Sequence, residues 1–179
     1  MRLIFALCVL ASPAFAAECP AVPDHSAAVD GILADLRIAR DQTEASQLTD
    51  ALWRIWMVAP DEAAQSLLNR GMQKRVEADF AGSTAILDEL VAYCPKYAEG
   101  YNQRAFTKFM AQDYAAAIAD IDAALAIEPH HLGALTGKVL SLIGLDRMDE
   151  AQLILRQALA LNPYLSERRL LIEPEGEDI

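Results

Sequence analysis

The chain has 179 residues, 54% of them hydrophobic, and a formal net charge of -11 at pH 7. This length allows one domain or one short array of repeats. The acidic excess repels phosphate backbones and anionic lipid surfaces, so it argues against nucleic acid or a membrane surface as a partner.

Residues 1–16 have the pattern of a secretory signal peptide. Arg2 gives the positive end, an apolar run follows, and Ala14 and Ala16 are small residues of the kind that precede a cleavage site. The run is short for a membrane span. A retained anchor or a later start site is the alternative. We expect cleavage, a bacterial periplasmic location, no membrane contact afterwards, and a mature chain with 14 basic and 26 acidic residues.

Cys19 and Cys94 remain after cleavage, in a compartment that permits disulfides. Closing this loop of 75 residues would contribute on the order of 4 kcal/mol by the chain-entropy estimate. The alternative is two free thiols, with Cys94 filling space at the end of a helix. We favour the disulfide and treat residues 17–28 as an N-terminal extension.

Residues 29–63 contain two helical patterns, the second of which ends before Pro60. Trp53 and Trp56 lie on neighbouring faces of the second pattern, where core packing against the next repeat is a more common role than a ligand platform. We interpret this segment as a degenerate first repeat.

Three clearer units follow, at residues 64–97, 98–131 and 132–165. Each consists of two helical stretches around a short turn and ends near a proline, and these prolines recur every 34 residues: Pro95, Pro129 and Pro163. A fixed period of this length indicates a stacked repeat array.

Other positions recur with the same period. The second unit carries Tyr101, Ala105, Ala117, Ile121, Ala124 and Pro129, and the third carries Leu135, Leu142, Ala151, Leu155, Ala158 and Pro163. This pattern resembles the tetratricopeptide repeat, over roughly residues 29–165. The resemblance implies an all-α, right-handed solenoid of stacked helix-turn-helix hairpins that binds a protein or peptide segment, without a cofactor. It further implies a scaffold in cell-envelope assembly or quality control, or else a structural, self-associating protein.

The turn between the two helices departs from the family pattern. Ala78, Gln112 and Asp146 occupy the position that favours glycine for its positive φ. We expect these turns to be slightly strained or differently shaped.

The resemblance also implies a binding groove, because the family builds its concave wall from first helices. The candidate groove residues are Leu68, Met72, Asn102, Phe106, Phe109, Met110, Leu140 and Ile143. Packing of Phe106 and Leu140 between helices is the alternative. Some family members hold a terminal carboxylate with Lys and Asn, but Leu68 and Met72 stand at those places, so we expect no such clamp.

A basic residue recurs on the first helix of each clear unit: Arg70, Arg104 and Lys138. These residues either pair with carboxylates on a second helix, such as Asp88, Asp120 or Asp122, or form a ladder that faces an anionic partner. We favour pairing, because an unpaired, half-buried charge is costly.

We find no catalytic or metal-binding set. His25, His130 and His131 are not in metal-ligand spacing with another His or a Cys, and the last two are expected in a solvated turn. We therefore expect no enzymatic activity and no metal.

Residues 166–179 form a short cap and an acidic tail. The cap is shorter than the helix it must cover, so Leu153, Leu155, Leu159 and Leu161 are candidates for exposure. We expect weak homodimerisation, or docking of another protein, through this end.

Overall fold

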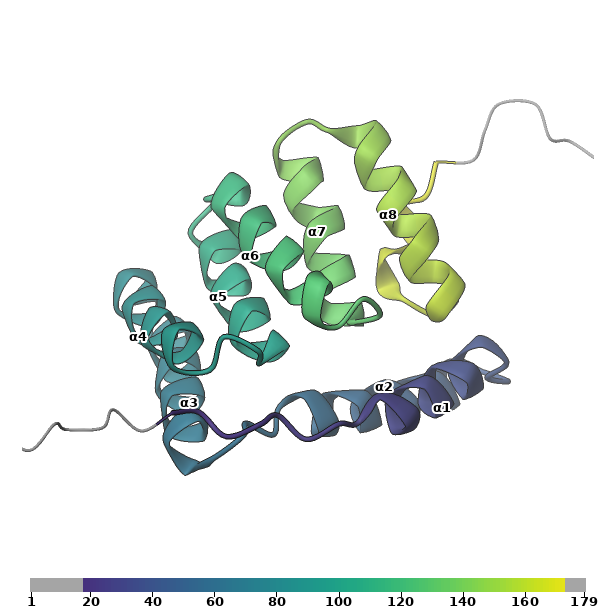
Figure 1. Cartoon of the computed structure of the whole chain (residues 1–179). Coiled ribbons are helices and arrows are strands. Elements are labelled where there is room, and N and C mark those ends of the chain that lie inside the picture. The colour runs from purple at the N-terminus through teal and green to yellow at the C-terminus, as the bar shows by residue number, and fades with distance from the viewer. Residues whose placement is uncertain (1–17, 173–179) are drawn as a thin grey trace, which may run out of the picture.

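The computed structural model describes residues 18–172, so the expected signal peptide and acidic tail lie almost wholly outside it. The described range contains these helices: α1 (Ser26–Arg37), α2 (Gln42–Trp56), α3 (Glu62–Val76), α4 (Phe80–Tyr93), α5 (Ala98–Met110), α6 (Tyr114–Ile127), α7 (Leu132–Gly144), α8 (Met148–Leu161) and the 3₁₀ helix η1 (Ser166–Leu170) (Figure 1). Within these residues, no helix has both the length and the apolarity to cross a bilayer.

The hairpins α3–α4, α5–α6 and α7–α8 stack in chain order, which confirms the expected all-α solenoid for this part of the chain (Figure 1). From α3 to α8, each helix packs on the next one in sequence. In addition, α3 contacts α5 and α5 contacts α7, so the first helices form a continuous wall.

Aspartates cap the N-termini of α2, α3, α4 and α6. The Asp79 carboxylate accepts a hydrogen bond from the Gly82 N–H at the start of α4, and Asp113 does the same for Ala116 at the start of α6. Of the two expectations for the turns, the structure shows the first: the residue two positions before α4, α6 and α8 has a positive φ, at Ala78 (59°), Gln112 (63°) and Asp146 (57°). The turns thus keep the geometry that the family fills with glycine, although none of the three is glycine.

Small residues allow close approach inside the stack. Ala117 and Ala124 on α6 are fully buried. A Cβ on Gly71 of α3 would lie 2.6 Å from the Leu87 side chain of α4, so the two helices meet where glycine stands.

Replacing Ala117 or Ala124 with leucine should lower the free energy of unfolding by about 1–3 kcal/mol, because the added methylenes overpack a close contact. Gln112→Ala, at an exposed turn, should change it by less than about 0.5 kcal/mol. Urea denaturation of the three variants checks this expectation. Equal midpoints would contradict the 34-residue register.

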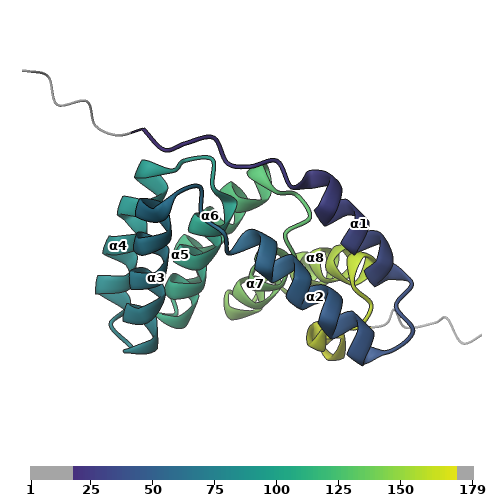
Figure 2. The ribbon, with the colours of Figure 1, turned by 90° about the horizontal axis from the view of Figure 1, so that it is seen from below.

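The first hairpin is not stacked as the sequence predicted. Instead of packing on α3 as α4 packs on α5, α1 and α2 lie across the edge of the array where α7 begins and α8 ends (Figures 1 and 2). Val29, Leu33 and Leu36 of α1 and Leu52 and Trp56 of α2 form one core with residues of those two helices: Leu132, Leu135, Ala158 and Leu161. The two helical patterns of residues 29–63 were identified correctly, but the surface on which they pack was not.

This placement changes the expectation for the C-terminal end. Leu155 and Leu161 are buried, because η1 packs on α8 from one side and α1 from another. Leu159 is half-buried, and Leu153 is 63% exposed. The uncovered apolar face is therefore smaller than the sequence predicted, which weakens the reason for dimerisation through this end.

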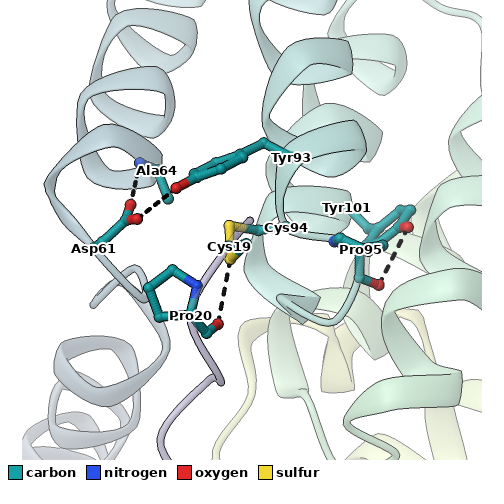
Figure 3. Close-up of a disulfide and its surroundings, with 8 residues drawn as sticks. All are labelled: Cys19, Pro20, Asp61, Ala64, Tyr93, Cys94, Pro95 and Tyr101. Atoms are coloured by element: carbon teal, nitrogen blue, oxygen red, sulfur yellow. Dashed lines mark hydrogen bonds between the residues drawn. A yellow bond between two sulfur atoms is a disulfide. The ribbon is translucent and has the colours of Figure 1, made fainter. Parts of the chain in front are cut away.

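The structure joins Cys19 to Cys94, with 5.2 Å between their Cα atoms (Figure 3). The bond fixes the segment before α1 to the end of α4. Beside it, the Tyr93 hydroxyl donates a hydrogen bond to Asp61, the residue that caps α3 (Figure 3). Two separate contacts therefore hold this corner of the molecule.

Candidate functional site

An open pocket of about 310 Å³ lies against the wall of first helices. Phe106 and Phe109 of α5 and Leu140 of α7 form apolar walls, and Trp53 of α2 closes one side. Arg75, Asn102, Thr136 and Glu167 contribute polar groups. Because Trp53 and Glu167 come from outside the stacked repeats, the pocket depends on the first hairpin and the C-terminal cap as well as on the solenoid.

The structure brings four of the eight candidate groove residues together in this pocket: Asn102, Phe106, Phe109 and Leu140. Leu68 is fully buried and was wrongly assigned, because its cluster includes Ala59 and Tyr97 and is covered by Met57, just after α2. Met72 packs on the same cluster. Ile143 packs on the core between α7 and α8, and Met110 is exposed outside the pocket lining.

The basic residues at the 34-residue period are mostly paired. Arg104 donates to Asp120 and to Asp88, and Lys138 lies 2.6 Å from Asp122. Burial opposes the charge of Arg104, but its bonds to Asp120 and Asp88 raise its pKa overall. Arg70 is exposed and has no ion pair within residues 18–172. A continuous ladder of available cations is therefore absent from the described part of α3, α5 and α7.

A buried polar network underlies the pocket, and sequence reasoning missed it. Glu99 is 1% exposed and accepts hydrogen bonds from Asn102, from Gln103 and from His131, whose Nε2 lies 2.8 Å from the carboxylate. Gln103 in turn accepts a bond of 2.7 Å from Arg75, so the network extends to the guanidinium at the pocket wall.

His131 corrects the expectation of a solvated turn, since it is fully buried at the start of α7. Its Nδ1 accepts a hydrogen bond from the Ala134 N–H, which places the ring proton on Nε2, where it is donated to Glu99. The imidazole is therefore neutral. One sequence signal was available: an aromatic residue, Tyr97, stands 34 residues earlier at the equivalent position of the period, and the structure buries it too.

The same imidazole connects the first hairpin to the solenoid. The Trp56 ring stacks on His131 with centroids 4.0 Å apart, and Trp53 meets it edge-on at 5.8 Å. A Cβ on Gly133 would lie 2.5 Å from the Trp53 ring, so only glycine lets the indole approach α7 this closely. The two tryptophans therefore do form core contacts, but with α7 instead of the next repeat.

Arg75 lies between the network and the pocket. Its guanidinium carbon is 4.6 Å from the centroid of Phe106, and its nitrogens donate to the side chain and the carbonyl of Gln103. Burial lowers the pKa of Arg75, and the charge of Glu99 acts in the opposite direction. The arginine thus orients Phe106 and balances a buried carboxylate.

The buried network around Glu99 and His131 has a structural role. Both nitrogens of His131 are engaged and its ring has no exposure, so it cannot exchange a proton with a bound molecule. Within residues 18–172, no three His, Cys, Asp or Glu side chains gather as metal ligands.

Comparison with known proteins agrees with this architecture. A TPR repeat-containing protein of Rhizobium etli is 31% identical over 158 residues, which cover 83% of this chain and 77% of the relative. The chain belongs to the tetratricopeptide repeat (TPR) family. The family model for the tetratricopeptide repeat matches residues 108–166. In this TPR chain, that match includes most of the second clear repeat and all of the third.

Solved TPR structures share the fold at low identity. The TPR domain of Arabidopsis OM64 superimposes with a TM-score of 0.58 at 20% identity, covering 61% of this chain and 90% of that one. The first TPR of Spaghetti (RPAP3), bound to an HSP90 peptide, also gives 0.58, at 19% identity, and covers 60% and 85%. A MamA double mutant gives 0.53 at 15% identity, covering 80% and 78%. These similarities support the TPR solenoid.

Proposed function

We propose that this protein is a non-catalytic scaffold that binds a protein or peptide segment in the pocket between α2, α5 and α7. The observation that carries the proposal is the pocket itself, which exposes Phe106 and Leu140 on the first-helix wall. A concave, largely apolar pocket with a few fixed polar groups is the usual form of a binding site. Solved TPR domains with HSP90 or HSP70 peptides support the same class of function.

The cellular setting is part of the proposal. The signal pattern of residues 1–16 favours export to a periplasm, with a role in envelope assembly or quality control. Determining the N-terminal residue of the protein recovered from the periplasm tests the export step. A mature protein that still begins at Met1 would contradict it.

Phe106→Ala should abolish capture of the partner from a periplasmic extract, because Phe106 is 46% exposed and forms a pocket wall. Gly137→Leu should do the same by filling the pocket, since a Cβ there meets nothing closer than Ile121 at 3.6 Å. Met110→Ala is the matched control, since it lies on the same helix with the same exposure but outside the pocket.

Mass spectrometry of the captured proteins, with circular dichroism of each variant, provides the measurement. A partner retained by the Met110 variant and lost from the other two, at equal helical content, is the expected result. Unchanged capture by both pocket variants would contradict the proposed binding site.

A further inference from the structure

We infer that the pocket accepts a segment with a large apolar or aromatic side chain next to a lysine or arginine, and that it rejects acidic termini. This inference rests on the proposed function and adds the chemistry of the occupant.

The cations of the first-helix wall are already engaged. Lys108 lies 2.7 Å from Asp120, Lys138 is bonded to Asp122, and Lys74 lies 3.2 Å from Glu77. Arg104 is held by two aspartates. Within the part of the chain that the structure describes, Arg70 is the wall cation without a polar partner, and it does not line the pocket. A bound carboxylate would therefore have to break an existing ion pair.

Arg75 does not supply the missing cation. Its nitrogens donate to Gln103, its face covers Phe106, and its charge is balanced by the buried carboxylate of Glu99. An incoming anion would compete with Glu99 for the charge of Arg75. It would also compete with Gln103 and Thr107 for the donors of this arginine. Withdrawal of Arg75 would leave Glu99 buried without its counter-charge, which is costly.

Glu167 gives the pocket its negative character. Its carboxylate lines the pocket from η1 and accepts a bond from the neighbouring Ser166 hydroxyl, with no ion pair among residues 18–172. The pocket lining contains one cation, Arg75, and one anion, Glu167. Arg75 is bonded to Gln103 and faces the charge of Glu99, so Glu167 is the lining charge without an ion-pair partner among the described residues. Beside the aromatic rings of Trp53 and Phe106, that carboxylate suits a cationic side chain.

The size of the pocket fits a single anchoring side chain. Its volume of about 310 Å³ is at the lower end of the range for ligand sites. The apolar walls would bury the anchor, and Glu167 would pair with a basic neighbour at the mouth. The overall charge of -11 favours the approach of the same class of segment.

A random peptide display library selected on the full mature protein tests the inference, with Phe106→Ala protein as the comparison. We expect the peptides that depend on Phe106 to carry an aromatic or aliphatic residue beside lysine or arginine. Phe106-dependent peptides that are acidic or neutral would overturn the inference and leave the proposed function intact. If no selected peptide depends on Phe106, both fail.

Glu167→Lys then provides a matched charge test. It should weaken the binding of the selected basic peptides by about tenfold or more, measured through the fluorescence of Trp53. Glu89→Lys makes the same charge change on an exposed part of α4 and should alter the affinity by less than about twofold. Equal effects of the two variants would show that only net charge matters, and would overturn the pairing with Glu167.

Discussion

Glu99→Ala should lower the free energy of unfolding by about 3–5 kcal/mol, the largest effect we expect from a single substitution in this chain. Glu99 is the common acceptor for Asn102, Gln103 and His131, so its loss leaves three buried donors without a partner. It also leaves Arg75 half-buried without its counter-charge. Urea denaturation measures the loss.

Two further variants separate the network from simple loss of volume. Glu99→Gln keeps the side-chain volume but places an amide donor against groups that already donate. We therefore expect the free energy of unfolding to fall by about 1–3 kcal/mol. Glu89→Ala removes an exposed carboxylate and should stay within about 0.5 kcal/mol of the natural protein. If Glu99→Ala matched Glu89→Ala, the network would contribute no net stability.

Tryptophan fluorescence adds a local measurement to the same experiment. Trp53 and Trp56 are the two tryptophans of the chain, and both rings meet His131. When Glu99 no longer holds the imidazole, the hairpin α1–α2 should loosen before the solenoid unfolds. The emission should therefore shift to the red at lower urea than the loss of helical signal. Coincident transitions would mean that the hairpin and the repeats unfold together.

The 34-residue period predicted the structural features that depend only on the register of the repeats. Asp88 stands 16 residues before Arg104, and Asp122 stands 16 residues before Lys138, so each cation joins a first helix to the second helix of the preceding hairpin. When two hairpins share a period, the same offset gives the same pairing. The positive φ at Ala78 has the same origin, because the length of the turn fixes its backbone conformation whichever residue occupies it.

The placement of the first hairpin could not be predicted in this way. An amphipathic stripe shows that a helix buries one face, but it does not identify the surface that covers this face. Leu33 and Leu52 would have satisfied the same pattern against α3 as they do against α7 and α8. Half of the candidate site followed from the resemblance to the repeat family, which builds its groove from first helices such as those that carry Phe106 and Leu140. The contributions of Trp53 and Glu167 did not, because they depend on this long-range packing.

Reducing the bond between Cys19 and Cys94 should destabilise the protein by on the order of 4 kcal/mol, because it frees a loop of 75 residues in the unfolded chain. Urea midpoints measured with and without dithiothreitol check this expectation. Cys19→Ser is the suitable control, since Cys19 is only partly buried while Cys94 is 1% exposed. The variant should match the reduced protein and should not respond to dithiothreitol.

The urea comparison requires that Cys19 and Cys94 are joined in the starting protein. Protein recovered from an oxidising compartment should contain no free thiol when it is alkylated under denaturing conditions without reductant, and mass spectrometry reads this directly. Two alkylated cysteines would mean that the bond does not form there. With the bond present, an unchanged midpoint after reduction would show that the buried cluster around Cys94 and Tyr97 holds the end of α4 without it. The segment before α1 would then have little effect on the stability of the repeats, and reduction would release this segment alone, which limited proteolysis would detect.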